Sequence, residues 1–286
     1  MSPDDLFLEV LRLELEKTLL QIADITHGRI SRPETLSDFL AYCALTLSVR
    51  TDPVHAKDRH AGLERLKSNY KGAEWQGFYQ GLIALCGASA HNTNSSQFTD
   101  FFAWPYIKIG AQNKALKQDF TPDDLARLMA AITLSQDTVL PEEGFFTMSD
   151  HACGSGTLLL AAADHFASLG FNPSKHLVVQ AVDMDVRCVH MTYLNLAFHG
   201  IPAVVVRGDT LTLEEHDRWY TPAYLWGKWI WRAPMPFGKG EHVSDEMLKR
   251  IDEPMYGALR QLEPLLSAVG VSSTADVSKN TLKNEV

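Results

Sequence analysis

Residues 150–157 read Asp-His-Ala-Cys-Gly-Ser-Gly-Thr, and this glycine-rich segment is the part of the sequence best suited to holding a ligand. A strand-like run, Phe145 to Ser149, comes before it, and a helix-like run, Thr157 to Leu169, follows it. Because glycine has no Cβ, the backbone at Gly154 and Gly156 can turn tightly and approach a bound molecule closely. A strand, a glycine turn and a helix in this order predict a site for a ligand that lies across strand ends.

Two aspartates follow the next two strand-like runs. The run from His176 to Val182 leads into Asp183, and the run from Ala203 to Val206 leads to Asp209. An acidic side chain at the first position typically accepts hydrogen bonds from the ribose hydroxyls of an adenine-containing cofactor. One at the second position can accept a hydrogen bond from the adenine amino group. The alternative is an α/β domain whose turns hold Gly and Asp for structural reasons alone, but three such features in register favour a cofactor site.

These residues resemble the motifs of the adenine-N6 DNA methyltransferases, particularly the modification subunits of type I restriction systems. Asp150 to Gly156 resembles the family motif Asp-Pro-x-Cys-Gly-Ser-Gly, with His151 in place of the proline. The segments that resemble the other motifs are Asp183-Met184-Asp185, Gly208-Asp209-Thr210-Leu211 and the upstream Asp119-Phe120-Thr121-Pro122. The resemblance runs from about Ala111 to Gly238.

This resemblance implies S-adenosylmethionine (SAM) as the cofactor and no metal. It also implies DNA as a partner, with a partner subunit for target recognition. The residues expected to bind SAM are Phe120, Thr121, Asp150, Ala152, Gly154, Gly156, Asp183, Met184, Asp209 and Thr210.

The segment expected to bind the methyl acceptor differs from the family motif. Relatives carry Asn/Asp-Pro-Pro-Tyr/Phe there, and the motif grips the amino group of a flipped adenine while its aromatic ring stacks on the base. This chain reads Ala233-Pro234-Met235-Pro236-Phe237-Gly238, so Pro234 stands where the catalytic Asn is expected. Pro236 and Phe237 remain as the expected catalytic residues of a degenerate motif. Three hypotheses therefore stay open: an adenine-N6 methyltransferase, an inactive SAM-binding pseudo-enzyme acting as a binding or assembly subunit, and an enzyme with another methyl acceptor.

The elements that must position these residues alternate between strand and helix, which predicts an α/β fold with a parallel sheet. We expect a Rossmann-like SAM-dependent methyltransferase domain over 111–268, with a sheet truncated or remodelled late in the chain. A helical domain precedes it over 1–110, and a flexible tail follows over 269–286. The finer expectations are a polar loop from Ala88 to Ser96, a helix capped by Thr121 with Pro122 first, a strand from Tyr224 to Trp231 and a helix from Asp245 to Leu266.

Bulk composition limits the function classes. The formal net charge of −9 argues mildly against tight DNA binding by this chain alone, since phosphate neutralisation supplies most non-specific affinity. The sequence lacks an apolar run long enough to span a bilayer, and the N-terminus has acids where a signal peptide has bases. The four scattered cysteines form no CxxC pair and fit a reducing cytoplasm.

Several other residues could do chemistry, but each has a plainer explanation. Cys188 and His190, two apart on a helix, point in different directions and make a poor metal pair. The candidates for a general base are His216, Asp217 and His242, although surface loop histidines are commoner. The tryptophans Trp219, Trp226, Trp229 and Trp231 could stack on bases, although strand spacing at the last two favours sheet core.

Overall fold

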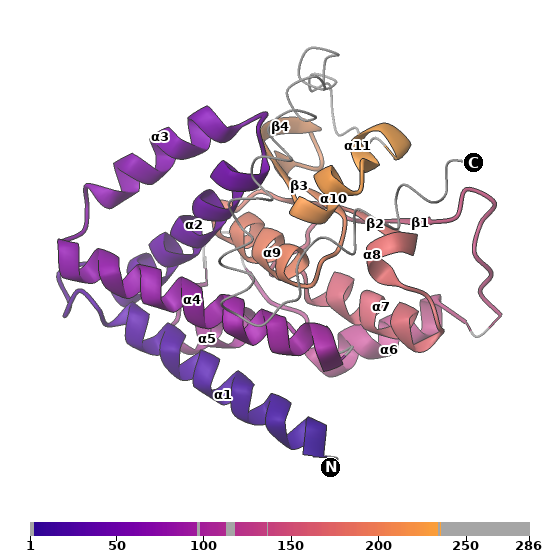
Figure 1. Cartoon of the computed structure of the whole chain (residues 1–286), viewed down its shortest axis with the longest axis horizontal. Helices are drawn as coiled ribbons and strands as arrows, with labels where there is room; N and C mark the ends of the chain where they lie inside the picture. The colour runs from indigo at the N-terminus through magenta and orange to yellow at the C-terminus, as the bar shows by residue number, and fades with distance from the viewer. Residues whose placement is uncertain (1–2, 96–97, 113–117, 136, 234, 236–286) are drawn as a thin grey trace, which may run out of the picture.

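The computed structural model describes residues 3–95, 98–112, 118–135, 137–233 and 235. In Figure 1 the first helices gather on one side of the molecule, and the sheet with its covering helices lies on the other. These first helices are α1 (Pro3–Ala23), α2 (Arg32–Thr51), α3 (Ala56–Lys67), α4 (Gly72–Ser95) and α5 (Ala103–Lys108). The predicted helical character of the first part of the chain is confirmed, but α4 runs on through residues 88–95 of the segment predicted as a polar loop. The short polar residues of that segment continue the last turns of the long helix.

Four strands form one sheet in the order β1-β2-β3-β4. The strands are β1 (Phe146–Asp150), β2 (Leu177–Asp183), β3 (Ala203–Asp209) and β4 (Glu214–Tyr220). The first three are parallel, whereas β4 folds back antiparallel to β3. The connecting helices are α7 (Thr157–Ser168), α8 (Pro173–His176) and α9 (Val186–Phe198). The predicted α/β, Rossmann-like fold is therefore confirmed. β1, β2 and α7 lie within one residue of the predicted runs, whereas β3 starts at the predicted Ala203 and runs three residues beyond the predicted Val206.

The predicted strand from Tyr224 to Trp231 is wrong. Two short helices, α10 (Pro222–Trp226) and α11 (Trp229–Arg232), occupy that stretch. Thr221 stands at the N-cap of α10, and Pro222 is its first residue, which is where proline is tolerated in a helix. The fourth strand comes earlier, in the charged sequence of β4. The sheet therefore grows beyond β3, and among the described residues no strand lies on the far side of β1.

Helix α6 (Asp123–Thr133) begins one residue later than predicted. Pro122 is its N-cap, and no side chain caps the first turn. Asp123 and Asp124 lie in that turn, where carboxylates interact favourably with the helix dipole. The helix packs against α7 through small side chains, which brings its N-terminal end toward the glycine turn.

The hydrophobic core is continuous from the first helices to the sheet. One cluster joins Leu19 of α1 and Phe39 of α2 to Val179 of β2 and Met191 of α9. A second cluster, which includes Val204 and residues of α10 and α11, covers the opposite face of the sheet. Helix α9 is thus packed between α2 and the sheet, and the division into domains at residue 110 stays a prediction.

Candidate functional site

The carboxyl ends of the parallel strands bring the three predicted aspartates to one edge of the sheet. Asp150 ends β1 opposite Ala181, so β2 runs two residues further before it reaches Asp183. Asp183 in turn lies opposite Arg207, so β3 extends two residues beyond it to Asp209. The three carboxylates therefore sit at successive, stepped strand ends, which is the edge where open α/β sheets bind ligands.

The glycine turn closes over this edge in a conformation that favours glycine. Gly154 and Gly156 have φ angles of +56° and +88°. A Cβ on Gly154 would lie 3.3 Å from the ring of Phe120, and one on Gly156 would lie 3.2 Å from the hydroxyl oxygen of Thr192. That hydroxyl donates to the carbonyl oxygen of Gly154 at 2.9 Å. The turn is thus tight, braced from α9, and free of side-chain bulk at both glycines.

Asp183 is fixed by backbone donors at the next strand end. Its Oδ2 accepts from the amide of Gly154 at 3.0 Å, and its Oδ1 accepts from the amide of Asp185 at 2.8 Å. Burial raises the pKa of this carboxyl above its usual value, although both amides work in the opposite direction. A carboxylate has about four lone-pair positions, so two remain for a ligand. Asp183 is therefore an acceptor whose orientation is fixed by two backbone amides.

The end of β3 supplies the third part of the edge. Asp209 accepts through Oδ1 from the amides of Leu211 and Thr212, at 2.8 and 3.2 Å. Thr210 donates from its hydroxyl to the carbonyl oxygen of His151 at 2.7 Å, which ties this loop to the glycine turn. Leu211 is 94% exposed, and Met184 beside Asp183 is 52% exposed. Two open apolar side chains thus flank the polar groups of this edge.

The remaining predicted cofactor residues lie around the turn. Phe120 packs edge-on against Tyr106 of α5, with ring centroids 5.8 Å apart, on the side of the turn that faces Gly154. Thr121 follows Phe120 and is half-exposed. Ala152 is exposed within the turn and donates its amide to Asp150. The predicted cofactor residues therefore gather at one edge, on four separate segments of the chain.

Asp100, which the sequence did not single out, holds the turn from behind. Its Oδ2 accepts from the hydroxyls of Ser155 and Thr157 at 2.5 and 2.7 Å. Its Oδ1 accepts from the side-chain amide of Asn195 at 2.9 Å and from two backbone amides just after Asp100 itself. Asn195 also donates to the carbonyl oxygen of Ser155. The indication of this contact in the sequence was the pair of hydroxyl residues, Ser155 and Thr157, because buried hydroxyls need a hydrogen-bond partner.

The acceptor-side motif is only partly described. Pro234, Pro236 and Phe237 lie outside the described residues, as does the predicted helix from Asp245 to Leu266. The carbonyl oxygens on either side of Pro234 are held: Tyr224 donates to that of Ala233, and Arg218 of β4 donates to that of Met235. The residues on either side of Pro234 are therefore anchored to α10 and to β4.

Asp217 has a structural partner rather than a role as a base. It lies on β4 and forms a two-pronged ion pair with Arg59 of α3, at 2.7 and 2.8 Å. The Arg59 guanidinium also lies 3.6 Å from the centroid of the Trp219 ring, and His190 packs edge-on against the same ring. This buried cluster fastens β4 to α3. His216 lies on β4 with a partly exposed side chain.

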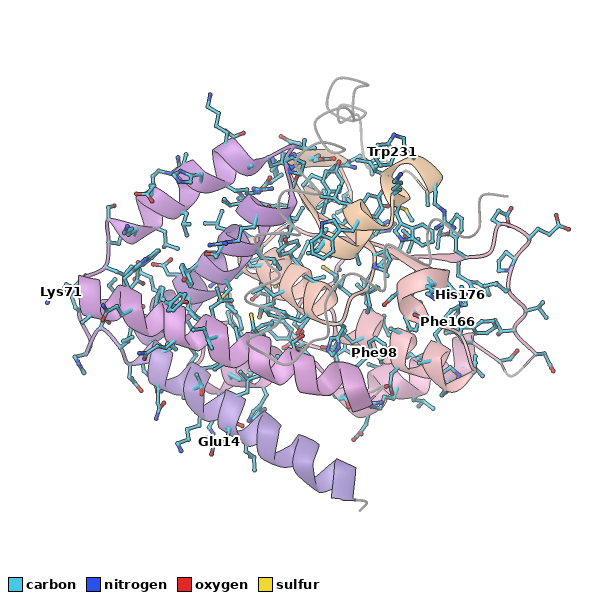
Figure 2. The ribbon with its side chains drawn as sticks, viewed as in Figure 1. Glu14, Lys71, Phe98, Phe166, His176 and Trp231 are labelled. Carbon is cyan, nitrogen blue, oxygen red and sulfur yellow. The ribbon has the colours of Figure 1, made fainter. Side chains whose placement is uncertain are left out.

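The other tryptophans and the cysteine–histidine pair are mostly core. Trp229 is buried on α11, whereas Trp231 on the same helix is 40% exposed at the rim of the molecule (Figure 2). Cys188 and His190 are both buried, while His242 lies outside the described residues. Among the described residues, no three His, Cys, Asp or Glu side chains gather as ligands of a metal ion would. None of the described helices has the length and apolar character needed to cross a bilayer.

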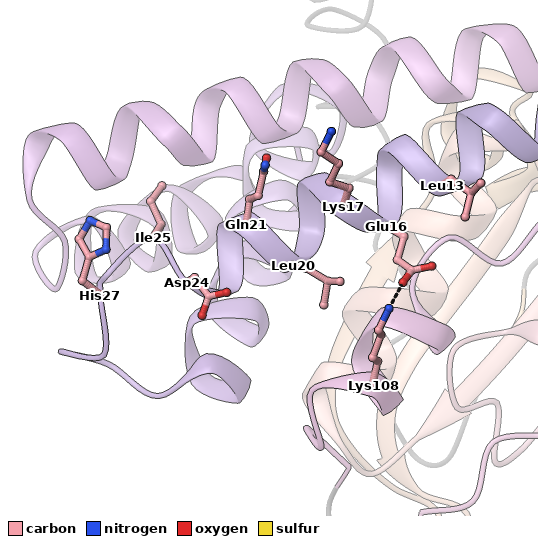
Figure 3. A pocket seen from close by; sticks show the side chains of 9 residues that line it. All are labelled: Leu13, Glu16, Lys17, Leu20, Gln21, Asp24, Ile25, His27 and Lys108. Atoms are coloured by element: carbon pink, nitrogen blue, oxygen red, sulfur yellow. Dashed lines mark hydrogen bonds and ion pairs between the residues drawn. The ribbon is translucent and has the colours of Figure 1, made fainter.

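A hollow between α1 and α5 lies away from the predicted edge. Figure 3 shows its lining, in which Glu16 and Lys108 form an ion pair at 2.5 Å beside Leu13 and Leu20. This pairing neutralises the two charges against each other. The lining also includes Lys17, Gln21, Asp24 and His27, but none of the residues predicted to bind the cofactor.

Comparison with known proteins agrees with the strand-end motifs. Residues 97–226 match the family model described as N-6 DNA Methylase. A crystal structure of the type I restriction-modification system methyltransferase subunit from Streptococcus thermophilus is similar at 14% identity and a TM-score of 0.34. That similarity covers 70% of this chain and 59% of the other, so this chain spans little more than half of that protein. A comparison with curated proteins finds no match. The matched residues 97–226 make up less than half of the chain, and they include the glycine turn and the three aspartates.

Proposed function

We propose that this chain is a DNA-methyltransferase-like protein that binds SAM at the carboxyl edge of its sheet. The observation that carries the proposal is the convergence of the Gly154–Gly156 turn with Asp183 and Asp209 at three successive strand ends. The match to the N-6 DNA methylase family supports it, because members of that family generally use SAM.

The residues at this edge fit the cofactor. A Cβ at Gly154 would fill the space beside Phe120, so the absence of a side chain there keeps open a cradle for the methionine portion. Phe120 and Thr121 would close over that portion. Asp150 and Ala152 would line the near side of the turn, where the amide of Ala152 fixes the Asp150 carboxylate.

The nucleoside half of SAM would lie toward β3. Asp183 has lone pairs left for the ribose hydroxyls. Oδ2 of Asp209 accepts no hydrogen bond from the described residues and would take the adenine amino group. Met184 and Leu211 would contact the two faces of the adenine, which explains two large exposed apolar side chains at a polar edge. Thr210 would hold the loop in place through His151.

Within this proposal the activity is methylation of adenine N6 in DNA. SAM supplies an electrophilic methyl group when bound, and the chain's own contribution is to orient it at the strand ends. The net charge of −9 supports a partner subunit that reads the target and supplies most of the phosphate contacts. The four free cysteines, three of them buried, support a cytoplasmic location.

A second candidate is a SAM-binding subunit that transfers no methyl group. It is favoured by Pro234, which has no side-chain amide to accept a hydrogen bond from an adenine amino group. It is also favoured by the fold of residues 222–233 as the short helices α10 and α11, which pack on one face of the sheet instead of forming the predicted strand. The two candidates share the cofactor site and differ only in what happens beside it.

Two measurements on the full chain separate these candidates. Calorimetric titration with SAM should show binding that Asp183→Ala abolishes and that Glu142→Ala, an exposed acid away from the edge, leaves unchanged. Equal binding by Asp183→Ala would show that the cofactor assignment is wrong. Nucleoside mass spectrometry on DNA from a methylation-deficient host should then show N6-methyladenine for the enzyme. Bound SAM with no methylated base would leave a partner-dependent enzyme or the non-catalytic subunit. Methylation gained by Pro234→Asn would then indicate an enzyme that has lost its catalytic residue, and no change would indicate a rebuilt site.

A further inference from the structure

Asp185 is a buried carboxylate two residues beyond Asp183, the residue proposed to bind the ribose. Asp185 is 6% exposed, and its backbone amide donates to Oδ1 of Asp183 at 2.8 Å. Its own Oδ1 accepts from the amide of Arg187 at 2.9 Å, which caps the first turn of α9. The guanidinium of Arg187 binds the same carboxylate, with Nε 2.9 and 3.1 Å from the two oxygens. Asp185 is therefore fixed beside Asp183 at the start of α9.

Gln118 connects this carboxylate to the segment that leads into α6. Its Nε2 donates to Oδ2 of Asp185 at 2.8 Å and to Sγ of Cys188 at 3.3 Å. Although burial by itself would raise the pKa of the Asp185 carboxyl, the hydrogen bonds from Arg187 outweigh burial and hold this pKa below its usual value. Gln118 therefore donates to a charged acceptor, which makes a stronger hydrogen bond than a neutral one.

Arg187 holds the chain at a second point, just after α5. Its Nη1 donates to the carbonyl oxygen of Ala111 at 3.1 Å, and its guanidinium lies 5.9 Å from the centroid of the Tyr106 ring. Gln112 also donates from its side chain to the carbonyl oxygen of Gln118 at 3.3 Å. The chain on both sides of residues 113–117 is therefore fixed to the start of α9.

These contacts bear on Phe120, which lies against the glycine turn. A Cβ at Gly154 would lie 3.3 Å from the Phe120 ring, and Tyr106 packs edge-on against that ring. A phenyl ring forms no conventional hydrogen bond, so its position depends on packing and on how the adjacent chain is held. The hydrogen bond from Gln118 to Asp185 fixes the chain two residues before the ring.

We propose that Gln118 is a positioning residue that holds Phe120 over the methionine portion of SAM. Through Asp185, its contact links the segment that would close over the methionine to the strand end that would hold the ribose. The inference rests on the proposed SAM site. It implies that the contact strengthens the binding of SAM but not that of adenosine, which lacks the methionine portion.

Substitutions at Gln118 test this role without altering the N-cap of α9. Gln118→Leu keeps a similar volume but loses the donor, whereas Gln118→Lys keeps an N–H donor for the Asp185 carboxylate. In calorimetric titrations of the full chain, Gln118→Leu should raise the Kd for SAM about tenfold and leave the Kd for adenosine unchanged. Gln118→Lys should keep the wild-type ratio of the two constants. Gln76→Leu, at an exposed glutamine of α4, is the matched control and should keep it as well.

Alkylation of Cys188 tests the same contact in the absence of any ligand. Cys188 is 1% exposed, and the side chain of Gln118 contacts its sulfur. Because leucine fills nearly the space of glutamine, Cys188 stays covered in Gln118→Leu unless the segment moves. N-ethylmaleimide should modify Cys188 about tenfold faster in Gln118→Leu than in the wild type, as measured by peptide mass spectrometry. Cys43, which is buried in α2, should keep its wild-type rate if the fold is intact.

The outcomes separate this inference from the proposed function. Equal rises in the Kd for SAM and for adenosine would overturn the positioning role, because they would indicate a general loss of the cofactor edge. Wild-type affinity for SAM in Gln118→Leu, or a wild-type rate of alkylation at Cys188, would overturn it too. A wild-type chain that binds neither ligand would overturn the proposed function, and this inference with it.

Discussion

Replacing Asp100 should loosen the glycine turn although Asp100 lies outside the cofactor edge. Five donors meet its carboxylate: the hydroxyls of Ser155 and Thr157, the side-chain amide of Asn195, and two backbone amides. In Asp100→Ala all five lose this acceptor. In Asp100→Asn the hydroxyls can rotate and accept from the new amide, so most partners are kept but the charge is lost.

The expected magnitudes follow from these contacts. Hydrogen bonds to a charged group contribute roughly 1.5–3 kcal/mol each, but Asp100 is only half-buried and water can replace part of the loss. Ser155 also keeps Thr157 as a neighbour, and Asn195 keeps the carbonyl oxygen of Ser155. We therefore expect Asp100→Ala to lower the free energy of unfolding by about 4 kcal/mol and Asp100→Asn by about 1.5 kcal/mol.

Urea denaturation measures the stability loss, and calorimetric titration measures SAM binding at a temperature where each variant stays folded. Since a loosened turn must be reordered by the ligand, the dissociation constant of Asp100→Ala should rise about tenfold, equivalent to 1.4 kcal/mol. Glu142→Ala serves as an exposed acidic control. An Asp100→Ala protein with wild-type stability would refute the reasoning. One that is destabilised but binds SAM with unchanged affinity would show that other contacts position the turn.

Three further outcomes can be measured. Gly156→Ala places a Cβ 3.2 Å from the Thr192 hydroxyl at a φ of +88°, so it should lower the free energy of unfolding by about 2 kcal/mol in urea denaturation. Gly87→Ala, where a Cβ meets open space, should not lower it. Equal losses of stability in the two variants would contradict the argument. Affinity for SAM should fall as the pH drops toward the raised pKa of Asp183, since only the ionised carboxylate accepts hydrogen bonds from two ribose hydroxyls. If the affinity of Asp183→Asn showed the same dependence on pH, the role of Asp183 in this pH effect would be refuted. Burial, together with the charge of Arg59, lowers the pKa of His190 from 6.5 to about 4, so the unfolded chain binds a proton at a higher pH than the folded chain. The free energy of unfolding should therefore fall by about 3 kcal/mol as the pH drops from 6.5 to about 4. In acid denaturation, His190→Gln should lose this dependence of stability on pH.

The glycine turn and the strand-end aspartates were predictable from the sequence because each of these features is local. A glycine turn between a strand and a helix needs only neighbouring residues, and Asp183 and Asp209 follow strands whose valine-rich runs identify them. The order of elements then dictates that parallel strands end at the same edge. For this reason β1, β2, β3 and α7 lie where the sequence predicts them.

The elements after β3 could not be predicted in the same way. β4 carries five charged or histidine side chains in succession, and its strand form depends on pairing with β3 and on the ion pair between Asp217 and Arg59. The aromatic spacing from Tyr224 to Trp231 suits a strand or a helix. Thr221–Pro222 is a helix-start signal of the same kind as Thr121–Pro122, and it was not used in the prediction from the sequence.

By itself the sequence determined the three-strand Rossmann-like core, the glycine turn with its strand-end aspartates and the degenerate acceptor motif, because each is encoded within a few neighbouring residues. Only the tertiary structure decided that the sheet extends past β3 with an antiparallel strand, that Asp100 braces the glycine turn, and that α6 exposes its larger apolar side chains. Each of these depends on contacts between segments far apart in the chain, whose partners no local pattern can specify.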